Sequence, residues 1–266
     1  MCVSFYLCAL KRASEYSDYS EYSDHSDYSE YSNCSEFVIP IIPMFKSLFR
    51  TNWLATLKLN LKLLPWHQAR RLPIVVEGPL RIEIGEEARI NLPKEARRGT
   101  ITLGSRHETY KAEAGKAQFS IFGTWNINGK IRIGLDSCLY IQREATLTTG
   151  TDIFIARDSQ IECAERITIG DNVLAGEIYI CDSAGHRVTH GEEVQPMTRP
   201  IYIGEGCYFG FRTMVLRGAS VPPHCVIGSG AVCTRDFAEA HPEGHLLLAG
   251  VPAEVKDFNV TPDCHV

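Results

Sequence analysis

The sequence of 266 residues contains no apolar run that approaches the roughly 20 residues needed to span a bilayer. Its formal net charge is −5 and its basic residues gather in only one short stretch, which argues against a nucleic-acid-binding surface. The ten cysteines include no C-x-x-C pair, which disfavours zinc or thioredoxin-type chemistry. Lys11 and Arg12 follow the short apolar start rather than precede it, so no export signal is expected. We therefore expect a cytoplasmic protein with free, mostly buried thiols.

Residues 14–36 have low complexity, because serine recurs at every third position from Ser14 to Ser35 with acidic residues and tyrosines between. A period of three fits neither a helix nor a strand, and the acidic residues repel one another. The sequence thus predicts a disordered tail over residues 1–43. Either changes in repeat number tune expression, or the tail is dispensable and lies upstream of a true start at Met44.

Residues 44–73 are predicted to form an amphipathic N-terminal helix. Leu54, Leu57, Leu61 and Leu64 fall at helical spacing, and Trp53 lies beside them. Lysines and arginines give the stretch a basic character. Two interpretations stay open: the helix packs on the main domain or on a neighbouring subunit, or it rests peripherally on an anionic membrane surface such as the bacterial inner membrane.

From residue 74 to about 231 the dominant pattern has a period of six, and the predicted domain extends over 74–258, before a C-terminal tail at 259–266. The large apolar positions of its clearest part are Ile203, Phe209, Val215, Val221 and Ile227. Four residues after each stands a small side chain: Cys207, Thr213, Ala219, Cys225 and Ala231. Such a repeat indicates short strands joined by tight corners, with three hexads to a triangular coil and coils stacked on one another. The fold class predicted is mainly β, a solenoid of parallel strands.

Two motifs near the C-terminus are more specific than the period. The first reads Gly-Ser-Gly-Ala-Val-Cys-Thr-Arg-Asp over 228–236, and the second reads Ala-Gly-Val-Pro-Ala over 249–253. In this order they resemble the end of the left-handed β-helix acyltransferases, a family that includes galactoside and maltose acetyltransferases and O-acetyltransferases of bacterial capsule and lipopolysaccharide. The resemblance implies a left-handed parallel β-helix, acetyl-CoA as co-substrate, no metal, and a homotrimer with sites between subunits.

Transfer of an acetyl group to a hydroxyl requires a base that takes the hydroxyl proton, and an imidazole suits this near neutral pH. The hexads stop near Ile180 and resume at Ile203, and the interruption contains His186 and His190. Family members carry their base in this loop, shortly before a segment like Pro-Ile-Tyr-Ile-Gly at 200–204, which makes His186 the predicted base and His190 the alternative. Asp182 is expected either to orient the imidazole or only to form a turn.

The resemblance also assigns contacts to both substrates. Gly210 would offer its N–H to the thioester oxygen, or would serve only as a corner glycine. Ser229 and Gly230 would contact the pantetheine arm, and Thr234 and Arg235 would lie near the phosphates. Tyr208 and His190 would contact the acceptor. Three departures bear on these contacts: Tyr208 stands where the family usually has tryptophan, Phe211 where a small residue is common, and Glu254 where some relatives carry arginine, which leaves Lys256 as the nearby cation.

The function predicted is acetyl transfer from acetyl-CoA to a hydroxyl of a sugar or surface glycan. An amino-sugar N-acetyltransferase and a non-catalytic solenoid used for binding or assembly are the alternatives. A zinc enzyme on the same solenoid is disfavoured, because the spacing of His186 and His190 does not match that of the γ-class carbonic anhydrases.

Overall fold

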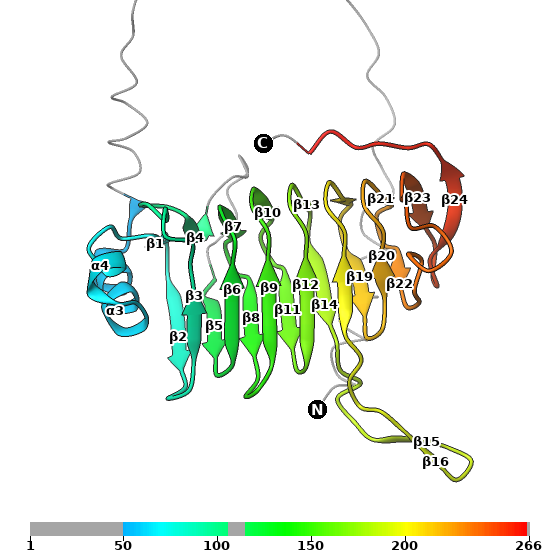
Figure 1. Cartoon of the computed structure of the whole chain (residues 1–266), viewed down its shortest axis with the longest axis horizontal. Helices are drawn as coiled ribbons and strands as arrows, with labels where there is room; N and C mark the ends of the chain where they lie inside the picture. The colour runs from blue at the N-terminus through cyan, green and yellow to red at the C-terminus, as the bar shows by residue number, and fades with distance from the viewer. Residues whose placement is uncertain (1–49, 106–114, 265–266) are drawn as a thin grey trace, which may run out of the picture. The chain divides into compact units, whose positions relative to one another are not determined.

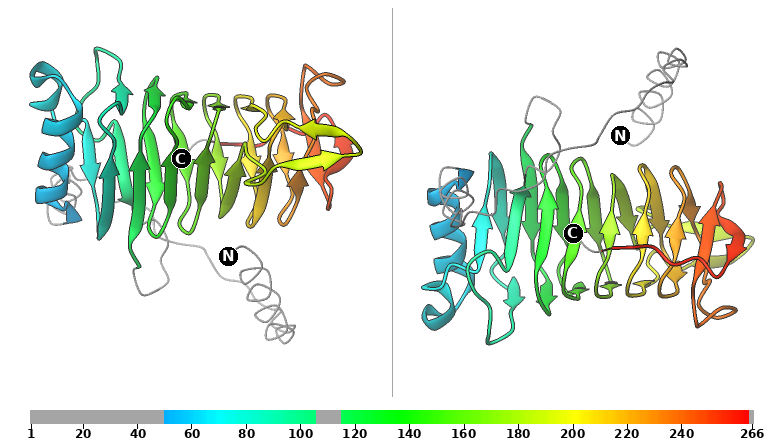
Figure 2. Two further views of the ribbon diagram at one scale, coloured as in Figure 1. Left: turned by 90° about the horizontal axis from the view of Figure 1, so that it is seen from below. Right: turned by 90° about the horizontal axis from the view of Figure 1, so that it is seen from above.

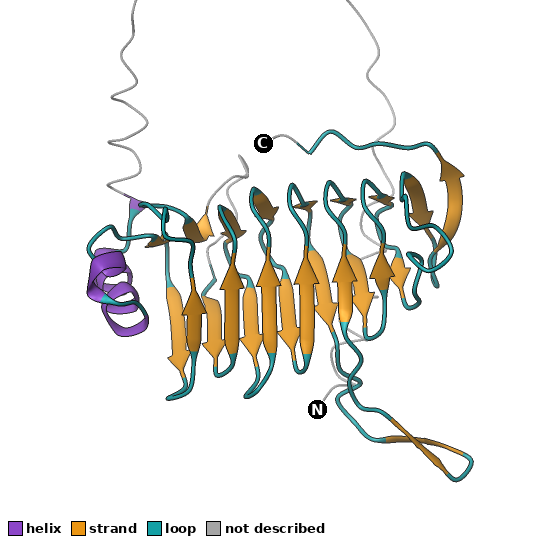
Figure 3. Cartoon of the chain, in the orientation of Figure 1, coloured by secondary structure: helices purple, strands orange, loops and turns teal. Residues whose placement is uncertain are grey.

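The computed structural model describes residues 50–105 and 115–264, so the predicted tail over 1–43 lies outside the described residues. The described part is a triangular solenoid whose three walls are sheets of parallel strands (Figure 1, Figure 3). The predicted fold class, a mainly β left-handed parallel β-helix behind a short N-terminal helix, is confirmed.

Each coil contributes one strand to each wall in a fixed order. The first wall contains β1 (Ile74–Val76), β4 (Ile101–Ser105), β7 (Ile131–Gly134), β10 (Ile153–Ile155), β13 (Leu174–Ala175), β18 (Tyr208–Phe209), β21 (Val226–Ile227), β23 (Leu246–Ala249) and the antiparallel β24 (Glu254–Phe258). The second contains β2 (Leu80–Ile84), β5 (Ala117–Ile121), β8 (Cys138–Ile141), β11 (Gln160–Cys163), β14 (Ile178–Cys181), β19 (Thr213–Leu216) and β22 (Val232–Cys233). The third contains β3 (Arg89–Asn91), β6 (Thr124–Ile127), β9 (Thr146–Thr149), β12 (Arg166–Ile169), β17 (Ile201–Ile203) and β20 (Ser220–Val221).

The interior of the solenoid follows the hexads. The five large and five small residues of the clearest hexads are at most 1% exposed. The glycine after a large residue permits close stacking of coils: a Cβ on Gly204 would lie 2.5 Å from the Pro223 nitrogen of the next coil. The cysteines Cys207 and Cys225 occupy small interior positions, as the pattern predicts, and both are free thiols.

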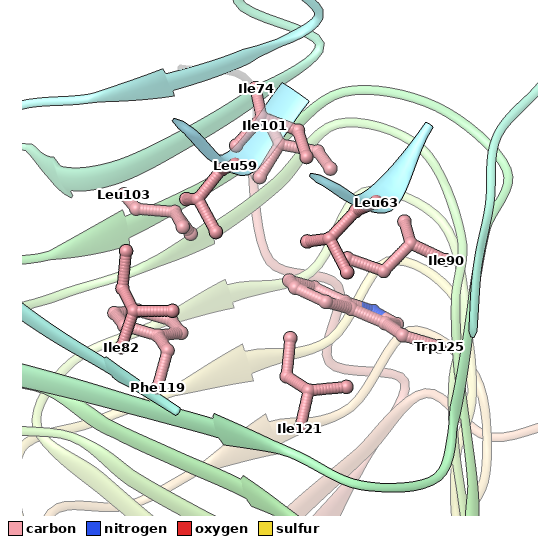
Figure 4. A pocket seen from close by; sticks show the side chains of 10 residues that line it. All are labelled: Leu59, Leu63, Ile74, Ile82, Ile90, Ile101, Leu103, Phe119, Ile121 and Trp125. Carbon is pink, nitrogen blue, oxygen red and sulfur yellow. The ribbon is translucent and has the colours of Figure 1, made fainter. Parts of the chain in front are cut away.

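Helices α3 (Trp53–Leu63) and α4 (Trp66–Ala69) lie across one end of the stack (Figure 2). Below α3, Leu59 and Leu63 meet an apolar interior that includes Ile74 and Trp125 (Figure 4). Two polar side chains of the helix complete the exposed edge of β1. Asn60 donates to Ile74 O (2.7 Å) and accepts from Ile74 N (3.1 Å), while Thr56 Oγ1 accepts from Val76 N (3.0 Å).

The orientation of α3 divides the predicted leucine stripe between two faces. Of the predicted leucine stripe, Leu64 is buried, whereas Leu54, Leu57 and Leu61 are exposed within the chain, where a neighbouring subunit or a membrane surface could meet them. The buried face instead carries Leu59 and the two polar residues described above, because a sheet edge needs hydrogen-bond partners more than it needs apolar cover.

Candidate functional site

The interruption of the hexads is a protruding hairpin. After β14 the chain leaves the corner between the second and third walls, forms β15 (Val188–His190) and β16 (Glu193–Gln195) as an antiparallel pair, and returns to β17 (Figure 1). His186 lies just before β15 and His190 at its end, opposite Glu193. Both histidines are exposed, so both imidazoles are accessible to a bound molecule.

The Asp182 side chain anchors the hairpin to the preceding coil. It is fully buried, and its carboxylate oxygens accept backbone N–H groups of Ala164 (2.7 Å), Glu165 (2.9 Å) and Arg166 (2.7 Å). These charge-assisted bonds satisfy the carboxylate without an imidazole. Within the chain Asp182 thus fixes the root of the hairpin on the preceding coil, and its predicted role in orienting His186 stays a prediction.

The base of the hairpin is held by further backbone contacts. Arg199 N donates to Asp182 O (3.0 Å), Ala184 N donates to Met197 O (2.8 Å), and Arg217 Nη1 donates to Pro196 O (2.8 Å). Arg217 belongs to the next coil and was not singled out from the sequence. Because Tyr202 pairs with Ser220 in the next coil, Arg217 lies next to the base of the hairpin. The spacing of the hexads predicts this pairing and could have indicated Arg217.

The corner between the first and second walls holds another group of predicted residues. Tyr208 is half-buried on the first wall, paired with Leu174 on one side and with Val226 on the other. Gly210 N donates to Ile227 O (2.8 Å) within the wall, and a Cβ on Gly210 would lie 2.6 Å from Ser229 Oγ. Within the chain the Gly210 N–H is thus occupied and the glycine permits close stacking of the coils, while its role toward the thioester oxygen stays a prediction.

The residues that follow Gly210 in this corner differ in their accessibility. Gly230 N donates to Phe211 O (2.9 Å), so this amide is also occupied. Ser229 is exposed, and its hydroxyl lies at the surface of the corner. Phe211 is 60% exposed beside it and projects away from the interior. A ligand at this corner would therefore meet Ser229, Phe211 and Arg212, whose guanidinium pairs with Glu177 at 3.4 Å.

The predicted phosphate-facing residues lie at the same corner as the hairpin. Thr234 and Arg235 are exposed directly after β22. Arg235 Nη2 donates to Ala253 O (3.1 Å), and its guanidinium lies 5.1 Å from the Phe237 ring centroid. Lys256 pairs with Glu254 at 2.9 Å, and the hydrogen bond and charge of Lys256, together with Arg235, lower the pKa of the Glu254 carboxyl.

Within one chain the predicted residues fall into two groups. His186, His190, Asp182, Thr234 and Arg235 lie at the second–third corner, whereas Tyr208, Gly210, Ser229 and Gly230 lie at or near the first–second corner. Strand β19, of four residues, separates the corners and spans about 13 Å. A single chain therefore does not bring its predicted base and its predicted pantetheine contacts together.

Among residues 50–105 and 115–264, no three His, Cys, Asp or Glu side chains gather in a way that could hold a metal ion. No helix in the described part of the chain has the length and apolar character of a membrane span.

Comparison with known proteins places the chain near the acetyltransferases, although no family model matches it. It is 32% identical over 163 residues to a probable acetyltransferase of Mycobacterium tuberculosis, a match covering 59% of this chain and 50% of that protein. It is 24% identical over 169 residues to the galactoside O-acetyltransferase of Escherichia coli, covering 62% of this chain and 79% of that protein. A galactoside O-acetyltransferase of Lactococcus lactis is 26% identical over 133 residues, covering 49% of this chain and 55% of that protein.

The chain thus spans about half the length of two of these relatives. Among solved structures, the polysialic-acid-specific acetyltransferase NeuO has the same fold, with a TM-score of 0.52 and 16% identity over 72% of this chain and 78% of that chain. In sequence and in fold, the chain resembles the hexapeptide-repeat acetyltransferases.

Proposed function

We propose that the chain is an acetyl-CoA-dependent O-acetyltransferase that acts, in the cytoplasm, on a sugar hydroxyl of a bacterial surface glycan. The observation that carries the proposal is the exposed histidine hairpin, which interrupts a solenoid of the acetyltransferase fold. The names of the two galactoside O-acetyltransferases favour an oxygen acceptor over an amine. The polysialic acid specificity of the structural relative favours a glycan.

In the proposed reaction His186 is the general base. Its imidazole takes the proton from the acceptor hydroxyl as the hydroxyl oxygen attacks the thioester carbonyl carbon. The new C–O ester bond forms, the C–S bond breaks, and the imidazolium returns the proton to the CoA thiolate. Asp182 acts only through the hairpin: by fixing the root of the loop it limits the positions that the imidazole can reach.

The two separated groups of residues favour a site built between subunits of a homotrimer. In such an assembly the second–third corner of one subunit faces the first–second corner of its neighbour, which brings His186 of one chain toward Ser229 of the next. The hairpin also carries exposed apolar side chains, Val188, Val194 and Met197, which are 43 to 56% exposed within one chain. Contact with a neighbouring subunit would bury them.

The donor would lie along the groove between subunits. Ser229 and Gly230 would border the pantetheine arm, and Thr234 and Arg235 would face the phosphates. Arg235 uses one of its five N–H donors on Ala253, so the others remain for a phosphate. Lys256 would contribute less, because Glu254 already balances its charge.

The test is an acetyl-transfer assay that follows CoA thiol release with candidate glycans as acceptors. His186→Ala should lower kcat/KM by about 10² to 10⁴, the usual contribution of a general base, with an unchanged melting temperature because the side chain is exposed. His67→Ala, which removes an exposed histidine of α4 at the other end of the stack, is the matched control and should stay within a few-fold of wild type. Undiminished CoA release in His186→Ala would refute the assignment, and preferential use of an amine acceptor would refute O-acetylation.

A further inference from the structure

Among the described residues, nothing covers the apolar outer face of α3. Thr56, Leu59 and Asn60 already occupy the face toward the solenoid. On the opposite face Leu54, Leu57 and Leu61 are 84%, 43% and 57% exposed, and they follow one another at helical spacing. Trp66, at the start of α4, which follows α3 in the chain, is 71% exposed. Because these residues lie at the end of the stack, no later coil of this chain can cover them (Figure 2).

The charge around this face has one sign. Residues 50–76 contain five lysines and arginines and no aspartate or glutamate, in a protein whose net charge is −5. Lys58 and Lys62 are exposed among the leucines, and the Arg98 guanidinium lies 5.0 Å from the Trp53 ring centroid. Arg71 Nη1 donates to the backbone oxygen of Lys94, in a neighbouring loop that also contains an acidic residue, Glu95. The surface thus combines apolar side chains with excess positive charge.

We propose that this surface, formed by Leu54, Leu57, Leu61, Trp66, Lys58 and Lys62 and here called the end cap, docks the protein on an anionic phospholipid membrane. The leucines and the tryptophan would enter the boundary between headgroups and acyl chains, while the lysines extend to the phosphates. A second copy of the end cap is a poor occupant, because its lysines would face like charges across the contact.

The geometry also sets how the solenoid would stand on the membrane. Since α3 lies across the end of the stack, docking would leave the walls and the histidine hairpin free in solution (Figure 2). Only the effect of multivalency rests on the homotrimer proposed above, in which three end caps would point in one direction. Three weak contacts would then act together, as for other multivalent binders.

The test is co-sedimentation of the full chain with vesicles of phosphatidylcholine alone and of phosphatidylcholine mixed with phosphatidylglycerol. Binding is expected only to the mixed vesicles, and added salt should weaken it. The variant Leu54→Gln/Leu57→Gln/Leu61→Gln should bind at least about tenfold less. Lys58→Gln/Lys62→Gln should lose about fivefold for each lysine.

Phe258→Gln, an exposed apolar residue at the opposite end of the stack, is the matched control and should bind as wild type. Acetyl transfer in solution should be unchanged in every variant, so failure of membrane docking is separable from failure of the proposed function. Equal binding to both vesicle types, or full binding by the leucine variant, would overturn the proposal. Sedimentation velocity without vesicles is the second measurement. If the wild type forms a larger oligomer than the leucine variant, the end cap binds another copy of the chain, and the proposal is also overturned.

Discussion

The late coils and the hairpin that precedes them differ in what their side chains contact. In the coils between 203 and 231, every large and small hexad position is buried and each coil covers the next. From 185 to 194 every residue of the hairpin is exposed within the chain. The buried side chains of the walls therefore stabilise the fold, while the exposed side chains of the hairpin contribute little to stability and are available to other molecules.

The largest contrast should appear in stability. Phe209→Ala removes a fully buried ring from the interior and should lower the free energy of unfolding by about 3 to 5 kcal/mol. Val188→Ala truncates a half-exposed residue of the hairpin and should change it by no more than about 0.5 kcal/mol. Urea unfolding of both variants measures the difference. Comparable losses would mean that the hairpin is part of the folding core.

The root of the hairpin should show an intermediate effect. Asp182→Asn leaves one acceptor oxygen where two oxygens accept three backbone N–H groups, so the free energy of unfolding should fall by about 1 to 3 kcal/mol. If the hairpin positions the base, kcat should fall while the KM for acetyl-CoA stays constant.

Asp171→Asn is the matched control for that variant. The Asp171 carboxylate accepts one backbone N–H, from Thr151 (2.8 Å), which an amide oxygen can also accept. Its stability and kcat should therefore stay near wild type. An Asp182→Asn enzyme with normal stability and normal kcat would show that the three hydrogen bonds do not fix the hairpin.

The smallest expected effect concerns a thiol of the wall. Burial, reinforced by the charge of nearby Asp182, raises the pKa of the Cys163 thiol from its ordinary value of 9.0 to about 12. Between these values the unfolded thiol is deprotonated and the folded one is not. The free energy of unfolding should therefore fall as the pH rises above 9. Below that pH the stabilisation that comes from the protonated Cys163 thiol should be fully present.

Melting temperatures measured across pH 9 test this point. Cys163→Ala should show a shallower decline than wild type on the alkaline side. Val173→Ala makes a comparable small cavity in the interior without removing a thiol, and should keep the wild-type slope. Parallel slopes for all three proteins would assign the alkaline decline to other groups.

The period of six predicted the walls because it reports which side chains point inward, as at Phe209 and Cys225. It could not report which neighbour each backbone group meets. The Gly210 N–H, predicted to meet the thioester oxygen, donates to Ile227 O, and this bond depends on the stacking of two coils. The hydrogen-bond partners of Asp182 could not be predicted for the same reason, because they belong to the preceding coil. The buried face of α3 was harder to predict for another reason. Asn60 and Thr56 are buried because they hydrogen-bond to the edge of β1, which the helical spacing of the leucines does not show.

A stack of parallel coils has no inherent length, since its last strands can accept another copy as readily as another coil. Here hydrogen bonds cap part of the edge at each end. At the first coil the polar side chains of α3 occupy the edge of β1. At the last, β24 pairs with β23, Ala253 N donates to Val232 O (2.8 Å), and Phe237 N donates to Ser220 O (2.8 Å). These stops keep a fold built like a filament from growing into one.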